Sequence, residues 1–426
     1  MKINIPESSQ ERVVIVGGGF AGLSVARQLA KSNYQVVLLD KNNHHQFQPL
    51  FYQVAMAGLE PSSIAFPFRK LFRRHKNVFF RVTEVQTIEP ENKRVITKLG
   101  ECNYDHLIIA IGADTNYYGN EEVAQNALPM KSVGEALYLR NTILSDYEKA
   151  LSVTGYDERQ GYVDIVIVGG GPTGVELAGA LAEMKKYILP KDYPELDTAE
   201  MDIHLIQGAP QLLAGMSDDS SNKALAYLQE MGVQVKLDTR VNRYDGEFAY
   251  LSDGDKIRSN KVIWAAGITG NHIPGLPEES ITYGRRLAVD RFNRVQGAEN
   301  IYALGDIAYM EEEAFPKGHP QVAQVAIQQG QTLADNLKRS LKQQDWKQFS
   351  YNDKGSMATV GRNRAVVDLP SFSFQGFPAW AVWLLVHLFA ILGTKNKVFV
   401  FLNWVWNYLT YDQSLRLIIR AKGKRE

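Results

Sequence analysis

The chain has 426 residues, with 47 basic and 47 acidic side chains that leave no formal net charge, and a single cysteine. This length accommodates two or three domains, the balanced charge gives no electrostatic footprint for nucleic acid, and one cysteine excludes a disulfide scaffold, an intrachain redox dithiol and a four-cysteine metal site. The polar stretch Met1–Glu11 has no apolar secretory segment. We therefore expect the start of the chain to lie in the cytoplasm or an equivalent reducing compartment.

The first predicted unit is a strand, a tight turn and a helix. Val13–Gly22 begins with four β-branched residues, which favour a buried strand, and continues with Gly17, Gly19 and Gly22 in the G-x-G-x-x-G spacing. Such glycines permit a tight turn and a close approach to a pyrophosphate, and the helix N-terminus attracts the phosphates. A second strand, Gln35–Leu39, ends in Asp40, which can accept hydrogen bonds from a ribose. We predict a dinucleotide-binding unit; the alternative is a turn that binds nothing.

The chain between this unit and residue 154 gives weaker signals. His44–Ala55 is aromatic and predicts no regular structure. Arg69–Lys76 carries five basic residues, which indicate a solvated helix face or, alternatively, a contact with anionic lipid. The other predicted elements are short strands at Asn77–Val85 and Arg94–Lys98, a buried strand at Leu107–Ala113 and a helical region over residues 132–154.

The opening pattern then recurs, which indicates an internal repeat. The second copy comprises a strand from Asp164, the glycines Gly169, Gly171 and Gly174, a helix at Val175–Lys186 and a strand at Asp202–Ile206. Lys261–Ile268 repeats the earlier strand that leads to Gly112, at nearly the same offset. Two related units predict that two nucleotides meet, for example a flavin and a nicotinamide. The alternative is structural repetition without ligands.

A last strand, Asn300–Ala303, leads to Gly305 and Asp306. A carboxylate at the carboxyl end of a strand lies where ligands bind in open α/β sheets. The alternative is a turn aspartate that caps the next helix.

Together these motifs resemble the two-dinucleotide-binding-domain flavoprotein superfamily, over roughly residues 10–340. The resemblance implies an α/β fold with two Rossmann-like domains. An FAD domain spans residues 1–154 and 276–345, and an NAD(P)H domain is inserted at 155–275. By this resemblance Asp40 binds the adenosine ribose of FAD, and Asp306 binds its ribityl chain. No metal ligand is implied.

The resemblance also implies the residues that bind the two cofactors. In chain order they are Gly17, Gly19, Phe20, Ala21, Gly22, Asp40, Lys41, Val82, Ala110, Gly112, Gly169, Gly171, Thr173, Gly174, Glu176, Gln207, Ala266, Gly267, Gly305, Asp306 and Gln324. Superfamily members that use a thiol acceptor need cysteines beside the flavin. Here Cys102 stands alone in a hairpin-like stretch, which argues against such an acceptor.

The segment Pro320–Gly330 indicates the electron acceptor. Pro320 suits the first turn of a helix, and Gln324 and Gln328 then share one helix face. A solvated polar face is the alternative. The pattern resembles the quinone-site helix of type II NADH:quinone oxidoreductases (alternative NADH dehydrogenases), which implies that both amides line a quinone pocket. In that family the residue matching Glu176 assists proton transfer, so we assign catalytic roles to these three side chains; for Glu176 the alternative is an acid favoured by the helix dipole.

The C-terminal residues, from Phe377 onward, indicate the environment in which the protein lies. Phe377–Gly393 is apolar all round but short for a membrane-spanning helix. Val398–Tyr411 is covered by aromatic and apolar residues apart from a narrow polar stripe of Asn396, Asn403, Asn407, Thr410 and Ser414. Cations follow at Arg416, Arg420, Lys422, Lys424 and Arg425. We therefore predict a C-terminal membrane-association region at residues 346–426, lying in the membrane interface; the alternative is a dimer interface or a capping core.

One residue departs from the NADH-specific pattern. The strand after the second glycine motif is followed by Gln207, where NADH-specific members carry an acid. A carboxylate repels the 2′-phosphate of NADPH, whereas a neutral amide does not. We favour NADH and leave NADPH open.

The expected protein is a non-pumping flavoenzyme of the respiratory chain that passes hydride from NAD(P)H to FAD and reduces a lipophilic quinone. We expect it to be peripheral (monotopic) on the cytoplasmic face of the inner membrane or an equivalent organellar face, to bind no nucleic acid and to allow a homodimer. The alternatives are a soluble NAD(P)H-dependent reductase of an iron–sulfur protein and a flavin-bound NAD(H)-sensing interaction protein.

Overall fold

The computed structural model describes residues 2–413 and 415–419. The chain divides into two compact units. Unit 1 comprises Met1–His45, Phe66–Asp114 and Ile268–Asp353, and unit 2 comprises Gln46–Ala65, Thr115–Gly267 and Lys354–Glu426. Ser414 and the cations from Arg420 onward, which the tail prediction used, lie outside the described residues.

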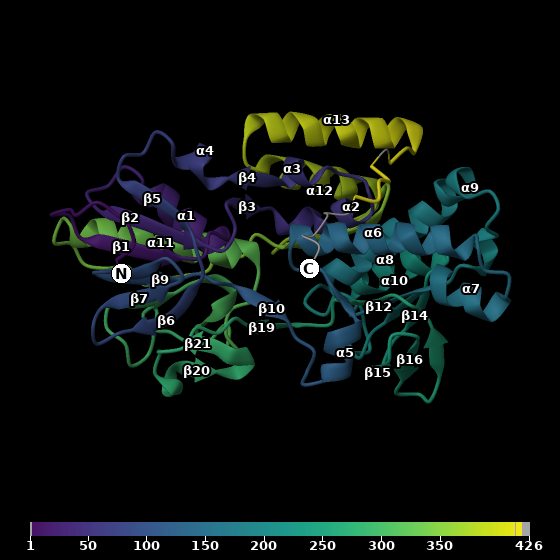
Figure 1. Cartoon of the computed structure of the whole chain (residues 1–426), viewed down its shortest axis with the longest axis horizontal. Helices are drawn as coiled ribbons and strands as arrows, with labels where there is room; N and C mark the ends of the chain where they lie inside the picture. The colour runs from purple at the N-terminus through teal and green to yellow at the C-terminus, as the bar shows by residue number, and fades with distance from the viewer. Residues whose placement is uncertain (1, 414, 420–426) are drawn as a thin grey trace, which may run out of the picture. The chain divides into compact units, whose positions relative to one another are not determined.

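Unit 1 is built on a parallel five-stranded sheet in the order β22-β9-β1-β2-β5 (Figure 1). Its strands are β1 (Arg12–Val16), β2 (Gln35–Asp40), β5 (Val78–Val82), β9 (His106–Ile109) and β22 (Ile301–Ala303). The central strand β1 is apolar and buried on both faces, as parallel strands covered by helices are. Helices α1 (Phe20–Leu29) and α11 (Ala323–Ser340) pack against each other in this unit.

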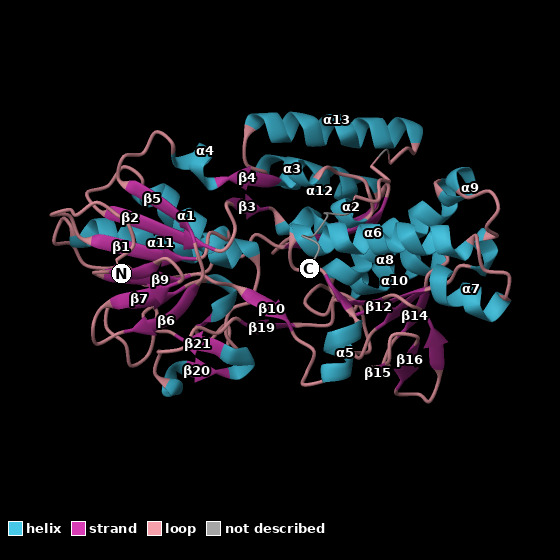
Figure 2. Cartoon of the chain, viewed as in Figure 1, coloured by secondary structure: helices cyan, strands magenta, loops and turns pink. Residues whose placement is uncertain are grey.

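Unit 2 repeats this arrangement with the sheet order β11-β18-β12-β13-β14; β12 and β14 are labelled among its strands in Figure 2. Its strands are β11 (Leu128–Pro129), β12 (Ile165–Val168), β13 (Ile203–Ile206), β14 (Gln234–Lys236) and β18 (Val262–Trp264). Helices α8 (Pro172–Tyr187) and α10 (Asp218–Glu230) belong to the same unit. The motif of each unit is thus a parallel β–α–β crossover with its glycines between strand and helix.

In both units a three-stranded antiparallel sheet follows an edge strand of the parallel sheet, β5 in unit 1 and β14 in unit 2. It is formed by β6 (Val85–Glu89), β7 (Arg94–Thr97) and β8 (Gly100–Asn103) in unit 1, and by β15 (Val241–Tyr244), β16 (Phe248–Leu251) and β17 (Lys256–Arg258) in unit 2. The next strand, β9 or β18, then returns to the central parallel strand. The internal repeat predicted from the glycine spacing is therefore confirmed as a repeat of topology.

The C-terminal segment adds a further sheet and two helices to unit 2. The sheet is β24 (Ser356–Gly361), β25 (Arg364–Asp368) and β26 (Ser373–Gln375), and the helices are α12 (Phe377–Ala390) and α13 (Thr394–Thr410). Figure 1 shows α13 running beside α12. Among the described residues, no helix combines the length and apolar character needed to cross a bilayer.

The remaining elements are short or connect the sheets. They are β3 (His44–Gln46), α2 (Phe51–Ala55), α3 (Pro61–Ile64), β4 (Ala65–Pro67), α4 (Phe68–Phe72), β10 (Ala113–Thr115), α5 (Glu121–Asn126), α6 (Val133–Ala150), α7 (Tyr156–Val163), α9 (Leu189–Asp192), β19 (Ile268–Gly270), β20 (Ile281–Thr282), β21 (Arg286–Ala288) and β23 (Ala308–Tyr309).

Three local expectations were wrong. The aromatic stretch after His44 contains the helix α2, because its apolar side chains are buried against α6. Asn77–Val85 is not one strand, since β5 ends at Val82 and β6 begins at Val85. Pro320 precedes α11 instead of lying in its first turn, because Val322 is extended and serves as the N-cap.

Candidate functional site

The first glycine motif forms an open helix N-terminus in unit 1. Gly17 has φ +98°, and a Cβ there would lie 2.3 Å from the carbonyl oxygen of Ala110; a Cβ on Gly22 would lie 1.9 Å from the oxygen of Gly17. Both positions therefore need glycine for the fold. By contrast, a Cβ on Gly19 would meet no atom within 4 Å, and Gly19 caps α1 without a side-chain hydrogen bond. The open space beside Gly19, at the N-terminus of α1, fits a pyrophosphate.

Asp40 lies beside this opening. Its Oδ2 accepts a 2.6 Å hydrogen bond from the backbone N–H of Gly18, and its Oδ1 accepts one of 2.6 Å from Asn42. Burial raises the pKa of Asp40, and the two backbone donors offset part of that shift. The Asp40 carboxylate thus joins the end of β2 to the glycine turn by a hydrogen bond. A hydrogen bond between this carboxylate and a ribose stays a prediction.

The second motif has the same geometry in unit 2. Gly169 has φ +110°, and a Cβ there would lie 2.5 Å from the carbonyl oxygen of Ala265; a Cβ on Gly174 would lie 1.9 Å from the oxygen of Gly169. Gly171 again has no neighbour within 4 Å, and it caps α8 without a side-chain hydrogen bond. Each unit therefore has an open space at a helix N-terminus, beside Gly19 in unit 1 and beside Gly171 in unit 2. We call these two spaces the glycine cradles.

Gln207 occupies in unit 2 the place that Asp40 occupies in unit 1. Its Oε1 accepts a 2.9 Å hydrogen bond from the backbone N–H of Gly170, and its Nε2 donates to the carbonyl oxygen of Gln211 at 3.0 Å. These two bonds fix the orientation of the amide. The neutral residue thus replaces the carboxylate in the same hydrogen-bonding position.

Asp306 and α11, which come late in the chain, belong to segments that pack against the first glycine motif and its helix α1. Gly305, which precedes Asp306, lies against Ala21, and its backbone N–H donates to Oε1 of the buried Gln329 at 2.7 Å. Ser24 of α1 donates to the carbonyl oxygen of Ile327 at 3.0 Å. Residues about 300 positions apart are therefore in contact within unit 1, and the role of Asp306 toward a cofactor stays a prediction.

The glutamines of α11 differ in their surroundings. Gln324 lies in the first turn. Gln328 donates through Nε2 to the carbonyl oxygen of Asn352 and accepts the backbone N–H of Asn352 through Oε1, both at 2.9 Å. Both functions of the Gln328 amide are thus engaged by the backbone, and a role toward quinone stays a prediction for either residue.

The other predicted cofactor residues lie at strand ends or in the first turn of a helix. Phe20 packs edge-on against His45 at 5.2 Å, and Tyr118 donates to the carbonyl oxygen of Ala266 at 2.8 Å. Val82 is exposed at the end of β5, and Thr173 is exposed in the first turn of α8. Lys41, Gly112 and Gly267 follow the ends of β2, β9 and β18.

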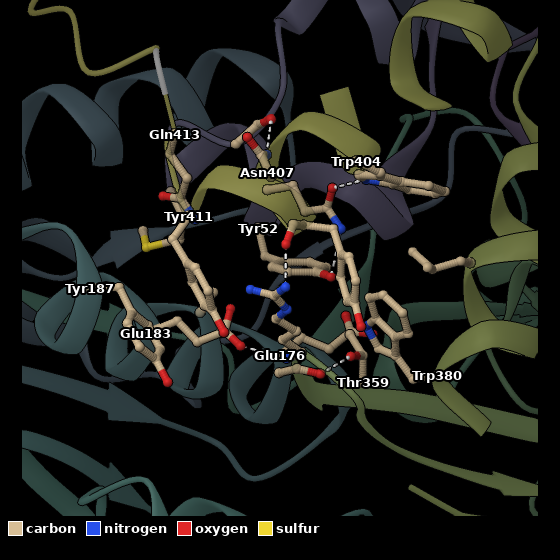
Figure 3. A pocket seen from close by; sticks show the side chains of 18 of the residues that line it. Tyr52, Glu176, Glu183, Tyr187, Thr359, Trp380, Trp404, Asn407, Tyr411 and Gln413 are labelled. Carbon is tan, nitrogen blue, oxygen red and sulfur yellow. Dashed lines mark hydrogen bonds between the residues drawn. The ribbon is translucent and has the colours of Figure 1, made fainter. Parts of the chain in front are cut away.

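Glu176 lies in a pocket of about 140 Å³ within unit 2 (Figure 3). The pocket is lined by aromatic side chains of α2, α12 and α13, among them Tyr52, Trp383 and Trp404. Burial raises the pKa of Glu176 to about 8, and hydrogen bonding from the Thr359 backbone offsets part of the shift. A carboxyl group that stays protonated near neutral pH can donate a proton.

The tail helix α13 packs with its polar stripe inward. Asn396 donates to the carbonyl oxygens of Ser62 and Ala65 at 3.2 and 3.1 Å, and Asn407 donates to that of Gly58 at 3.3 Å. The Trp404 indole donates to Oε1 of Gln53 at 2.7 Å. Asn396 and Asn407 of the stripe therefore bind the body of unit 2, and the apolar side of the helix is exposed.

That exposed side forms one surface with α12, which we call the apolar tail face. Its side chains are Leu385, Val386, Phe389, Val398, Phe399, Phe401, Leu402, Val405, Trp406 and Leu409, each at least 39% exposed. Arg416, one of the predicted flanking cations, pairs with Asp192 and Asp412. A contiguous apolar face of this kind marks a contact with membrane or protein.

Two residues, one in each unit, were missed in the sequence analysis. Glu183 lines the same pocket as Glu176, and a signal was present because the two share one face of α8 at i and i+7. Gln329 holds the Gly305 turn, but nothing in the sequence distinguishes its amide from those of its neighbours. Cys102 is buried in β8, and burial raises the pKa of its thiol, as expected for an inert side chain.

Comparison with known proteins agrees with this geometry. A family model described as pyridine nucleotide-disulphide oxidoreductase matches residues 11–330, and one described as the NDH2 C-terminal domain matches residues 354–411. The type II NADH:quinone oxidoreductase Ndh of Mycobacterium tuberculosis is 35% identical over 94% of this chain and 89% of its own length. The internal alternative NAD(P)H-ubiquinone oxidoreductase A1 of Arabidopsis thaliana mitochondria is 26% identical over 95% of this chain and 85% of its own length.

Among solved structures, NDH2 of Plasmodium falciparum in complex with NADH superposes with a TM-score of 0.88. It is 21% identical, and the match covers 96% of this chain and all of that one. The two units thus define a protein of the pyridine nucleotide-disulphide oxidoreductase class, which confirms the α/β fold and the superfamily resemblance. More narrowly, the chain belongs to the type II NADH:quinone oxidoreductase family.

Proposed function

We propose that this chain oxidises NADH and reduces a lipophilic quinone to its quinol, with FAD as its cofactor. The observation that carries the proposal is the pair of open glycine cradles, one in each unit, in a chain of this family. When bound, FAD accepts two electrons from a nicotinamide and passes them to a second substrate. The protein contributes binding, orientation and proton supply.

In this proposal unit 1 holds FAD and the second motif holds NADH. The proposal keeps the domain boundaries expected from the sequence, 1–154 and 276–345 for FAD and 155–275 for NADH, although residues 46–65 and 115–154 lie in the compact unit 2. Backbone N–H groups at Gly19 and Gly171 bind the two pyrophosphates. Asp40 and Asp306 accept hydrogen bonds from hydroxyl groups of FAD. Gln324, at the start of α11, lies at a helix end whose dipole favours negative charge.

The apolar tail face supports a location on a membrane surface. Its exposed aromatic and aliphatic side chains match those of helices that lie in the membrane interface, where α12 and α13 would sit without spanning. A quinone dissolved in the bilayer is then within reach of the protein. We assign the cytoplasmic face of the inner membrane or an equivalent organellar face. A homodimer through the same tail is the competing use of this surface.

The function is tested with detergent-solubilised, full-length protein. We expect stopped-flow mixing with NADH to bleach the flavin absorbance quickly and mixing with a lipophilic quinone to restore it, at rates that account for steady-state turnover. A flavin that NADH reduces far more slowly than turnover requires would favour the NAD(H)-sensing alternative. Rapid reduction without reoxidation by quinone would favour an iron–sulfur acceptor.

Gln207 sets the nucleotide preference in this proposal. The substitution Gln207→Glu places a carboxylate at the hydrogen-bonding position beside Gly170, where it repels a 2′-phosphate. We expect kcat/KM for NADPH to fall at least about tenfold relative to NADH, which corresponds to about 1.4 kcal/mol. The matched control is Gln229→Glu on α10, which adds the same charge at an exposed position. An unchanged NADH to NADPH ratio in Gln207→Glu would refute this role.

A further inference from the structure

The pocket of unit 2 is lined along one side by a single stripe of α8. Glu176, Ala180, Glu183 and Tyr187 are spaced at i, i+4, i+7 and i+11, and all four line the pocket. Figure 3 shows Glu176, Glu183 and Tyr187 following one another along this side. Two carboxyl groups on one helix stripe therefore face the same cavity.

The cavity is large enough to hold a chain of water molecules between these carboxyl groups. A helical separation of seven residues is about 10.5 Å along the axis, which is too far for a direct hydrogen bond. The volume of about 140 Å³ accommodates roughly ten waters, at 10–15 Å³ of probe volume each. Two or three waters suffice to join the groups.

Glu183 has one oxygen committed to the protein. Its Oε1 accepts a 2.5 Å hydrogen bond from the backbone N–H of Arg362. No other hydrogen bond of this carboxyl group is seen among the described residues, which leaves Oε2 for water. Burial raises the pKa of Glu183, and the Arg362 backbone and guanidinium offset part of that shift.

The charged and titratable groups around the two carboxyls are few. From the β24–β25 hairpin, Arg362 and Arg364 act on Glu183, and Arg362 is held between the Tyr408 and Tyr411 rings at 3.9 Å from each centroid. Glu230 of α10 pairs with Arg364 at 3.4 Å. The phenol of Tyr52, on α2, faces both carboxyl groups, and burial together with their charge keeps its pKa high.

We propose that Glu183 and the water of this pocket form a proton relay that reprotonates Glu176 during quinone reduction. The proposal rests on the proposed function, in which Glu176 is the proton donor. Tyr187, Tyr411 and Gln413 line the pocket as well. Tyr411 is 38% exposed, so this end admits protons from the solvent. Glu183 acts through Glu176 and is a positioning and relay residue.

The proton balance requires such a supply. Reducing a quinone to a quinol takes two electrons and two protons. The hydride of NADH carries both electrons and one proton, so one proton per turnover comes from water. The O–H bond of Glu176 breaks as an O–H bond of the quinol forms, Glu183 then returns a proton to Glu176 through water, and solvent reprotonates Glu183.

The test uses detergent-solubilised, full-length holoenzyme and the variants Glu183→Gln, Glu183→Asp, Glu183→Ala and Glu176→Gln. Glu183→Gln should lower kcat for quinone about tenfold or more, with the larger loss above about pH 8, where Glu176 must be reprotonated against its pKa. KM for NADH and the rate at which NADH bleaches the flavin should not change. Glu183→Asp should keep most activity, and imidazole should restore Glu183→Ala.

A second measurement is independent of turnover. Infrared difference spectra of the protein between about pH 6 and pH 10 should show the protonated-carboxyl band of Glu176, whose pKa is raised to about 8. This band should be lost in Glu176→Gln, and its titration should shift in Glu183→Gln because the two carboxyl groups share the water of the pocket. Glu158→Gln, an exposed glutamate of α7, is the matched control and should change neither spectrum nor rate.

The outcomes separate the relay from the function on which it rests. Wild-type flavin that NADH does not reduce refutes the proposed function. A silent Glu176→Gln refutes the role of Glu176 and with it the relay. An impaired Glu176→Gln with a silent Glu183→Gln refutes the relay alone. A loss in Glu183→Gln that is independent of pH, with no rescue of Glu183→Ala by imidazole, also overturns it, because that is the signature of structural damage.

Discussion

Replacing Gly19 with valine is expected to remove FAD from the protein without unfolding it. A Cβ on Gly19 meets no protein atom within 4 Å, so the added side chain fills only the space that we assign to the pyrophosphate. The purified variant should be colourless, and its far-ultraviolet circular dichroism should match that of wild-type protein stripped of flavin. We expect the flavin affinity to fall by about 100-fold or more, equivalent to about 3 kcal/mol.

The repeat supplies a matched partner for this variant. Gly171→Val occupies the equivalent open position in unit 2, and it should retain FAD while KM for NADH rises by about 10- to 100-fold. Gly22→Val serves as the contrast, because its side chain would strike the carbonyl oxygen of Gly17, 1.9 Å from the new Cβ, and should destabilise the fold. If Gly171→Val loses flavin and Gly19→Val keeps it, the assignment of cofactors to the units is reversed.

The double substitution Phe389→Glu and Leu409→Glu should release the protein from membranes. Both side chains are more than 70% exposed on the apolar tail face, at 71% and 72%. Burying each in a bilayer contributes about 1.5–3 kcal/mol, and a carboxylate adds a desolvation cost. Binding to lipid vesicles should therefore weaken by about 100-fold or more, as measured by flotation.

The control for this variant is Tyr283→Glu. Tyr283 is 84% exposed but belongs to unit 1, outside the apolar tail face, so its substitution should leave flotation unchanged. Reduction of a water-soluble quinone should survive in the double variant and in Tyr283→Glu, since none of these three side chains lines a glycine cradle. A double variant that still floats with vesicles, or that changes only from dimer to monomer, would assign the face to a protein contact.

The sequence is most informative where one residue type is demanded locally. Gly17 and Gly169 have positive φ and a backbone oxygen within 2.5 Å of any Cβ, so the constraint is readable from spacing alone. The repeat is readable for the same reason, since both copies obey identical sterics. The positions of Asp40 and Gln207 beside the glycine turns are also readable from the sequence, because each lies at the end of the strand that follows its motif.

Residues whose partners are distant in sequence were less predictable. Gln328 was grouped with Gln324 by helix periodicity, but periodicity cannot show that the Asn352 backbone takes both functions of its amide. Likewise the polar stripe of α13 was correctly seen as narrow, yet only the fold shows that Asn396 and Asn407 bind carbonyl groups near residue 60. Long-range hydrogen bonds decide which face of a helix turns inward.

The inward polar stripe of α13 has a consequence for how the tail responds to its surroundings. If α13 separated from the body of unit 2 inside a bilayer, the amides of Asn396 and Asn407 and the indole of Trp404 would lose their acceptors without gaining water. In aqueous solution the same separation costs less, because water replaces the lost partners. On the proposed membrane location, a bilayer against the apolar tail face therefore makes separation of α13 from unit 2 more costly. The same effect stabilises the wall that Trp404 and Asn407 give to the pocket of Glu176 and Glu183.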